Sequence, residues 1–294
     1  MDNSISDSFI NYIENIDIEH NKLAEKHFDC IIAGGGLKGY YNFGICKILK
    51  KMNDKKLINI RKYVCVSAGA IIATYLMCNI PLKYSITIYH NIQNTQKDLH
   101  TVIVETMNNL LPKNAHEICN GKIHIVLSKI TIWGFEKVVI NHFKSRQHLL
   151  DVLSASIFLP GFTSNNISGI LIENERYFDG WFHSNVPINI NNDLPQLIIE
   201  THNVNYNSNH IFTFTDTCPE LLIIKGAIEM EQFLNNKHIT SLPIKWYTNS
   251  KNNKMNNHNN KYKITNIFLL LMFIIMLFLF CVVFIFKFIF IIIV

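Results

Sequence analysis

The sequence predicts an α/β fold with a largely parallel sheet, and three observations support it. Short runs of β-branched and aromatic residues alternate with longer segments whose apolar residues recur at helical spacing. Strands and helices that alternate in this way usually form parallel sheets. Two of the strand-like runs also stop at glycine or small residues and continue directly into a helical pattern. With 294 residues, the chain is long enough for a domain with an ample core.

The N-terminal half is expected to hold two strand–helix units. The run HFDCIIA at 27–33 is a short buried strand, and it leads through three glycines into a helix at 38–50. A second strand at 62–66 leads into an apolar helix at 68–78. A proline then breaks the chain, and the segment 81–111 is expected to be helical.

The C-terminal half is expected to complete the sheet. Segment 122–132 alternates polar and apolar residues as a strand does, and Ser145 is placed to cap a following helix. A turn at Asn174 and Glu175 is expected to join two short strands into a hairpin. The strands expected in this half lie at 122–132, 136–143, 167–173, 176–178 and 195–201, and the helices at 145–158 and 221–234.

Four segments are expected along the chain. Residues 1–26 form a polar leader that lacks the basic and apolar regions of a secretory signal. Residues 27–245 form the α/β domain, and residues 246–263 form an Asn- and Lys-rich linker. Residues 264–294 are expected to be a transmembrane anchor rather than a buried core helix. The uncharged run Ile264–Phe286 would span roughly 35 Å as a helix, which is enough to cross a bilayer.

Charge and cysteine content indicate partners and compartment. The formal net charge is +5, but five lysines and no acidic residue lie after residue 245, so the domain itself is nearly neutral. We therefore expect no nucleic-acid partner. The lysines that precede the apolar segment favour a cytosolic location for the domain. The seven cysteines are scattered and include no Cys-x-x-Cys pair, as expected for buried thiols in a reducing compartment.

The glycine loop GGGLKG, at 34–39, allows three interpretations. It can be a tight strand-to-helix turn with no further role. It can be a dinucleotide site, because Gly34, Gly36 and Gly39 fit G-x-G-x-x-G. Asp54 then has the spacing of the acidic residue that such sites need. The loop can also be an oxyanion hole, because glycines at a helix N-terminus leave backbone N–H groups unpaired.

The second strand-to-helix turn carries a serine in the position of a nucleophile. A nucleophile elbow needs a strand, a sharp turn with the serine, and a helix directly behind it. In YVCVSAGA, Cys65, Ser67 and Gly69 take the three defined positions of G-x-S-x-G. Cysteine replaces the first glycine, and the other two positions fit. Ser67 alone is equally compatible with a simple helix N-cap, but its combination with the glycine loop favours an elbow.

A nucleophilic serine needs a base, and the stretch ERYFDGWFHS offers two. His183 follows a short strand and is the more common type of base. Asp179 ends that strand and precedes Gly180. A carboxylate serves as base when burial raises its pKa and it hydrogen-bonds the serine directly. Because Asp-Gly also marks ordinary turns, the residues leave both assignments open.

Taken in order, these motifs resemble the patatin-like phospholipase family. The glycine loop, the Val-Ser-Ala-Gly turn, and an Asp-Gly pair followed by Asn185 and Pro187 stand in the family's order. The stretch ASIFLPGF at 155–162, ahead of RYFDGW, is similar to the adiponutrin and adipose triglyceride lipase branch. The resemblance covers roughly residues 28–188, over half of the chain.

The resemblance implies a three-layer α/β/α sandwich with a Ser–Asp dyad that acts on lipid acyl esters, without a metal or other cofactor. Ser67 would be the nucleophile and Asp179 the base, and His183 would be structural. The backbone N–H groups of three loop residues, Gly35, Gly36 and Leu37, would form the oxyanion hole. The residues that complete the motifs are Gly34, Lys38, Gly39, Cys65, Gly69, Gly180 and Trp181.

Two departures from the family pattern bear on activity. Cys65 replaces the first glycine of the elbow, and Trp181 replaces the small residue that follows Asp-Gly. An indole beside Asp179 can narrow the acyl site, shift the carboxylate, or close the site as a lid. These departures make a catalytically inactive domain that binds lipid or a protein partner the main alternative to an enzyme.

The sequence therefore predicts a membrane-anchored lipid acyl hydrolase, a serine-dependent carboxylic ester hydrolase. Its expected substrates are membrane lipids or lysolipids, and its C-terminal helix is expected to hold it at the membrane. The alternatives are the inactive domain, a hydrolase that uses His183 or another distant histidine, and a nucleotide-binding domain. The same motifs serve different head groups and both hydrolysis and acyl transfer, and they carry no signal for an oligomeric state.

Overall fold

A computed structural model of the chain describes residues 8, 11–13, 15–16, 23, 25–93, 97–132, 134–183, 192–201, 218–235 and 243–248. Its strands are β1 (His27–Ile32), β2 (Asn59–Cys65), β3 (Ile123–Thr131), β4 (Gly134–Ile140), β5 (Ile170–Ile172), β6 (Glu175–Asp179), β7 (Gln196–Ile199) and β8 (Ile244–Tyr247). Its helices are α2 (Gly39–Asp54), α3 (Ala68–Met77), α4 (Leu82–Gln93), α5 (Leu99–Leu110), α6 (Ala115–Cys119), α7 (Arg146–Ser156) and α8 (Pro219–Asn235), with short 3-10 helices η1 (Gly36–Lys38) and η2 (Gly180–Phe182).

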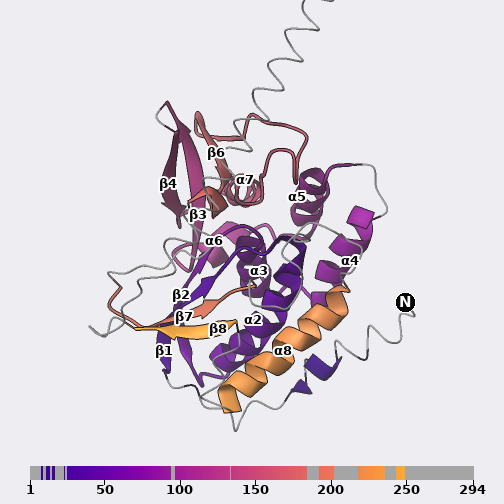
Figure 1. Ribbon diagram of the computed structural model, residues 1–294, viewed down its shortest axis with the longest axis vertical. Helices are drawn as coiled ribbons and strands as arrows, with labels where there is room; N and C mark the ends of the chain where they lie inside the picture. Colours follow the sequence, from indigo (N-terminus) through magenta and orange to yellow (C-terminus); the bar gives the residue numbers. More distant parts are fainter. Residues whose placement is uncertain are drawn as a thin grey trace, which may run out of the picture. The chain divides into compact units, whose positions relative to one another are not determined.

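One mixed sheet organises these elements (Figure 1). Its strands lie in the order β5-β6-β3-β2-β1-β7-β8, and β4 pairs with β3 off this path. The neighbouring strands β3, β2, β1 and β7 run parallel. Antiparallel partners flank them on both sides. The predicted α/β class with a parallel centre is confirmed.

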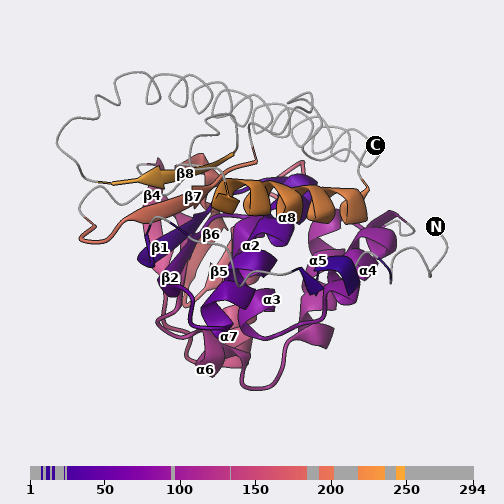
Figure 2. The same ribbon diagram turned by 90° about the horizontal axis from the view of Figure 1, so that it is seen from below.

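Alternation along β1 explains how the helices cover the sheet. Phe28, Cys30 and Ile32 point into the main hydrophobic core, which also takes residues of α2, α3 and α7. Ile31 and its neighbour Ala33 instead belong to a small cluster on the other face. Figure 2 shows the described helices gathered on one side of the strands β1 and β2. A helical layer on the second face, which a three-layer sandwich needs, is not among the described residues.

Helices α2 and α8 pack closely through glycines. A Cβ atom added to Gly44 of α2 would lie 1.9 Å from the carbonyl oxygen of Ile223. A Cβ added to Gly226 of α8 would lie 2.0 Å from the carbonyl oxygen of Tyr41. Both distances are far below van der Waals contact, so this helix pair depends on glycine at both positions. The contact positions α2, which begins at the glycine loop.

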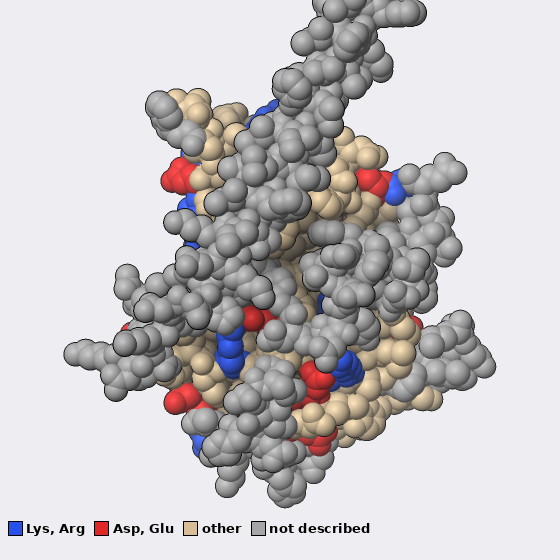
Figure 3. All heavy atoms as spheres, viewed as in Figure 1, with Lys and Arg blue, Asp and Glu red and all other residues tan. Residues whose placement is uncertain are grey.

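Surface charges of the described part are mixed in sign. On the face drawn in Figure 3, basic and acidic side chains lie interspersed. One partly buried ion pair joins two neighbouring strands, because Arg61 of β2 donates two 2.8 Å hydrogen bonds to the buried carboxylate of Asp29 in β1. Asn192 adds a 2.7 Å hydrogen bond to the same carboxylate. The bidentate Arg61–Asp29 pair links β1 to β2. The Asn192 hydrogen bond connects this pair to the segment that precedes β7.

Several element boundaries differ from the sequence-based expectation. The segment 81–111 forms two helices, because Asp98 caps α5 by accepting a hydrogen bond from the Thr101 N–H. The hairpin turns one residue earlier than expected, at Glu173 and Asn174, which both have positive φ. Neither α6 nor β8 was predicted, and β8 crosses the expected domain boundary at 245.

Several predicted segments lie wholly or mostly outside the described residues. They include the anchor at 264–294, nearly all of the linker, and Asn185 with Pro187. Within the part that is described, no helix combines the length and apolar character of a membrane span. Described residues of the predicted leader contact the domain, since Ile13 is buried in the main core and the Lys51 ammonium donates a 2.6 Å hydrogen bond to the Ile16 carbonyl.

The α2–α8 contact gives a stability prediction. Gly44→Ala should lower the free energy of unfolding by roughly 1–3 kcal/mol, because the clash with a backbone carbonyl outweighs the better helix propensity of alanine. Urea unfolding of the purified protein measures this change. Ile228→Ala, at a partly exposed position of α8, is the control and should cost less. Equal stability of Gly44→Ala and the unmodified protein would contradict this packing.

Candidate active site

The two strand-to-helix turns singled out in the sequence lie side by side. β1 and β2 are adjacent and parallel, and Ile32 pairs with Cys65 at their carboxyl ends. The glycine loop and Ser67 therefore leave the sheet at the same edge, where ligand sites of α/β folds form. The helices behind the turns also touch, since a Cβ added to Gly39 would lie 3.2 Å from the Ala68 Cβ.

Ser67 has a strained backbone. Its φ of 55° and ψ of −134° lie in a region that residues with a Cβ rarely adopt. Ser67 occupies the N-cap position of α3, but its side chain makes no capping hydrogen bond. The side chain is partly exposed. Capping therefore does not account for the serine, and the geometry is that of a sharp turn that presents a hydroxyl.

The residues around Ser67 fit the crowding of this turn. A Cβ on Gly69 would lie 2.6 Å from the Ile32 carbonyl oxygen, so the second glycine of the motif is required where α3 passes the end of β1. Cys65 stands in place of the first glycine, and it is fully buried in register with Ile32 and Ile125. Burial raises the pKa of the Cys65 thiol well above its usual value, which keeps it neutral. The turn therefore forms with cysteine in place of glycine.

The glycine loop presents unused backbone donors. Gly36 has a φ of 53°, a conformation that glycine adopts without strain, and it begins η1. In the described part of the chain, the N–H groups of Gly35, Gly36 and Leu37 donate to no acceptor. A Cβ on Gly35 would lie 2.7 Å from Thr201 side-chain atoms, so Thr201 of the sheet edge fixes the loop closely. Lys38 is buried, which lowers the pKa of its ammonium group.

The backbone of Asp179 is fixed on both sides. Its N–H donates to the Phe158 carbonyl at 3.2 Å, and its carbonyl accepts a 2.8 Å hydrogen bond from the Ser128 hydroxyl. A Cβ on Gly180 would lie 2.3 Å from the Val126 carbonyl oxygen, so the chain after Asp179 passes directly against β3. The contact with Phe158 gives the ASIFLPGF stretch a structural role that its sequence did not indicate. Ser128 was not anticipated.

The Asp179 carboxyl group is buried next to Ser67. Its side chain is fully buried, and Oδ1 accepts a 2.9 Å hydrogen bond from the Trp181 N–H. Oδ2 is buried without a hydrogen-bond partner in the described part. Burial raises the pKa of Asp179 to about 7, against the lowering influence of the Ser67 side chain and the Trp181 N–H. The carboxyl group thus changes its charge near neutral pH.

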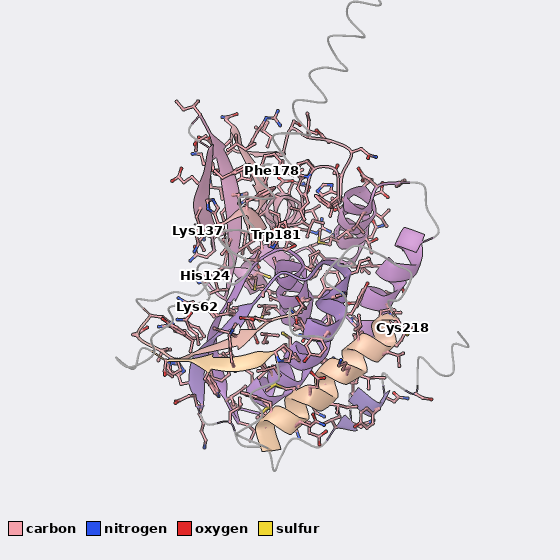
Figure 4. All side chains as sticks on the ribbon, viewed as in Figure 1. Lys62, His124, Lys137, Phe178, Trp181 and Cys218 are labelled. Carbon is pink, nitrogen blue, oxygen red and sulfur yellow. The ribbon has the colours of Figure 1, made fainter. Side chains whose placement is uncertain are left out.

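Trp181 and His183 both belong to the stretch after β6. Trp181 donates a hydrogen bond from its backbone N–H to the Asp179 carboxyl group. It is not among the described residues that line the apolar groove at Ser67. His183 interacts with the backbone of Glu136 in β4, and burial lowers the pKa of its imidazole. In Figure 4, Trp181 lies at the end of the sheet that also carries Phe178 and Lys137.

Ser67 lies at an apolar groove. Its wall follows one face of α3, and helices α2, α4 and α5 and the segment after α7 contribute the other sides. The glycine loop contributes Gly36 and Leu37, so the unused N–H donors lie at the same groove as the serine. The groove had no sequence signal, because its lining comes from helices far apart in the chain. Representative apolar lining residues are Phe43, Ile71, Ile88, Ile103 and Ile157.

The geometry also bears on cofactor sites. Asp54, the acidic residue considered for a nucleotide ribose, lies in the last turn of α2 and pairs with Lys50 at 2.6 Å. It does not end a strand, as dinucleotide sites need. Among the described residues, no cluster of three or more His, Cys, Asp or Glu is placed to hold a metal ion.

The family model and the similar proteins that the comparisons found point to the same family. The family model of patatin-like phospholipases matches residues 31–96. The chain is 28% identical over 178 residues to 1-acylglycerol-3-phosphate O-acyltransferase Pnpla3 of Mus musculus, covering 56% of this chain and 41% of that protein. It is 27% identical over 169 residues to the mouse omega-hydroxyceramide transacylase, covering 53% of this chain and 27% of that protein. It is 26% identical over 182 residues to mouse patatin-like phospholipase domain-containing protein 2, covering 56% of this chain and 35% of that protein. The chain thus spans less than half the length of these relatives.

The strain at Ser67 predicts a stability difference between two variants. Ser67→Ala and Ser67→Gly both remove the hydroxyl, but only glycine adopts this φ and ψ without strain. We expect Ser67→Gly to exceed Ser67→Ala in free energy of unfolding by about 1 kcal/mol. Urea titrations of the two variants give the comparison directly. If the alanine variant is as stable as the glycine variant, the turn is not strained.

The buried Asp179 predicts how stability depends on pH. The folded protein holds the Asp179 proton up to a pKa of about 7, whereas an unfolded aspartate loses its proton near 3.8. The folded state therefore binds more protons between these values, and this group makes stability fall as pH rises through that window. Asp179→Asn should raise the free energy of unfolding at about pH 8 by up to about 4 kcal/mol.

Urea unfolding of both proteins at about pH 5 and about pH 8 measures this effect. The gain from Asp179→Asn should be larger at the higher pH, because the unmodified carboxyl is charged there. If Asp179→Asn is instead less stable than the unmodified protein at the higher pH, the fold stabilises the charged carboxylate, which would contradict the prediction.

Proposed function

Because the chain belongs to the patatin-like phospholipase family, we propose that it hydrolyses lipid acyl esters with Ser67 as nucleophile and Asp179 as base. One observation carries this proposal. A strained, partly exposed serine lies beside a buried carboxyl group whose pKa is raised to about 7, and an apolar groove begins at the serine. The groove suits an acyl chain, and the polar groups at its start suit an ester.

In the proposed reaction, the Ser67 hydroxyl oxygen attacks the ester carbonyl carbon while Asp179 accepts the hydroxyl proton. The unpartnered Oδ2 atom is the available acceptor, since Oδ1 already holds the Trp181 N–H. Negative charge that develops on the carbonyl oxygen is stabilised by the free N–H groups of Gly35, Gly36 and Leu37. Collapse of this intermediate breaks the ester bond, and the leaving alcohol takes the proton back from Asp179.

The second half of the proposed reaction regenerates the enzyme. A water molecule attacks the acyl-serine carbonyl and gives a proton to Asp179, and the collapse returns that proton to Ser67 and releases the fatty acid. An alcohol in place of water would give acyl transfer by the same steps. Two of the mouse relatives are named as an O-acyltransferase and a transacylase. For this chain we propose hydrolysis, with membrane lipids or lysolipids as substrates.

The raised pKa suits the base that this scheme needs. A general base works best when its pKa lies near the working pH, because it is then both deprotonated and basic. An ordinary aspartate with a pKa near 4 would be too weak a base. Burial of Asp179 therefore converts a common carboxyl group into a base suited to neutral pH.

We also propose that the apolar segment 264–294 anchors the enzyme in a membrane, with the domain on the cytosolic side. The support comes from the uncharged run and its flanking lysines in the sequence. A flexible linker of the composition of 250–263 has a root-mean-square span of roughly 20 Å, which would allow the domain to reach the lipid surface.

Ester hydrolysis by three variants tests the dyad. Ser67→Ala and Asp179→Asn should each lower kcat for a lysophospholipid by roughly a thousandfold or more, because each removes a group that takes part in bond making. His183→Ala should keep kcat within a few-fold, because its imidazole interacts with β4 instead. Fatty-acid release by the purified proteins is the measurement, and circular dichroism controls for folding.

The three variants also separate the alternatives. Equal loss in His183→Ala and Asp179→Asn would favour a histidine-dependent mechanism. Full activity of Ser67→Ala would contradict the proposed nucleophile, and absence of fatty-acid release by the unmodified protein would favour a lipid-binding domain.

A further inference from the structure

Two residues that line the groove carry buried hydroxyl groups that have no hydrogen-bond partner in the described part of the chain. Tyr75 of α3 and Ser85 of α4 both line the groove, and only 1% and 4% of the surface of these two residues is exposed. In the described part of the chain, neither the Tyr75 hydroxyl nor the Ser85 hydroxyl has a partner. A buried polar group without a partner is costly, so each such group in a fold calls for an explanation.

Other hydroxyls in helices of the described part donate to a backbone carbonyl of their own helix. Thr74 donates to the Ala70 carbonyl, and Thr87 donates to the Lys83 carbonyl, each at four residues' distance along its helix. Ser85 sits in the same helix as Thr87 and makes no such bond. Its carbonyl is bound by the Tyr40 hydroxyl at 2.9 Å, which fixes this part of α4 against the start of α2. Ser85 is thus held at the groove with its hydroxyl buried and unbonded.

The position of these hydroxyls along the groove is defined by α3. Ser67 precedes the helix, and Ile71 and Tyr75 follow at intervals of four residues, which places all three on one face. Tyr75 is therefore roughly 12 Å along the helix axis from Ser67. An acyl chain whose carbonyl is at Ser67 would pass the apolar residues first and meet the hydroxyls farther in.

We propose that Tyr75 and Ser85 form a polar subsite that selects acyl chains carrying an oxygen, such as a hydroxyl group, part-way along the chain. This inference rests on the proposed function, because it places the ester at Ser67. A chain hydroxyl would accept a hydrogen bond from Tyr75 and exchange a second one with Ser85. An unsubstituted chain would leave both protein hydroxyls unpaired in an apolar setting, where a hydrogen bond counts most.

Direct binding tests the subsite without requiring turnover. The full chain with Ser67→Ala is titrated by calorimetry with octadecanoic acid and with isomers hydroxylated at successive carbons. We expect one or two neighbouring hydroxyl positions to bind roughly three- to tenfold more tightly than the unsubstituted acid, the factor that a net hydrogen bond supplies. Equal affinity of all isomers, or a steady loss with any hydroxyl, would overturn the proposal.

Substitutions in the same background identify the groups responsible. Tyr75→Phe and Ser85→Ala, singly and together, should bring the affinity ratio of the preferred isomer to the unsubstituted acid close to one. Tyr63→Phe is the matched control, because Tyr63 is also a buried tyrosine with an unpartnered hydroxyl but does not line the groove. It should leave the ratio unchanged. A ratio unaffected by the Tyr75 and Ser85 substitutions would assign the preference to another part of the protein.

These outcomes separate the subsite from the proposed chemistry. Selective binding together with no ester hydrolysis by the unmodified protein would support the subsite and contradict the proposed enzyme. Hydrolysis of lipid esters together with no preference among the isomers would support the enzyme and contradict the subsite.

Discussion

The close approach of two strand ends to the start of α3 is the constraint on which the site depends. The carbonyl of Ile32 lies where a side chain on Gly69 would be, and the first turn of α2 packs against Ala68 in the same way. This crowding leaves Ser67 a turn so sharp that its backbone adopts a positive φ. The serine is therefore presented at the sheet edge, next to the donors of the glycine loop, by backbone packing rather than by its own hydrogen bonds.

The burial of Asp179 links the stability of the fold to its chemistry. The Asp179 backbone is held by the Phe158 carbonyl and the Ser128 hydroxyl, so the carboxyl group remains buried although its charged form is disfavoured there. That cost raises the pKa toward neutrality, which is what a carboxylate base needs. Functional sites commonly concentrate strain and desolvation in this manner. Here the serine carries backbone strain, and the aspartate carries the desolvation.

Local patterns were sufficient for the two strand–helix units and for the turns that end them. The glycines and the serine are short-range signals, since they describe what the backbone must do at one position. The break at Asp98 was missed because a side-chain cap, rather than hydrophobic periodicity, starts α5. The groove, the contact between Phe158 and Asp179, and the pair of Tyr75 and Ser85 were not predictable. They arise from packing between elements that are distant in the sequence.

Labelling with a fluorophosphonate across a pH series tests whether Asp179 activates Ser67. The probe reacts with a serine only when a base activates it. We expect the modified peptide to contain Ser67 and the labelling rate to rise with a midpoint near pH 7 as Asp179 loses its proton. His183→Ala should show the same pH dependence as the unmodified protein. Absence of labelling at Ser67 in the folded protein, or a pH dependence that disappears only in His183→Ala, would contradict it.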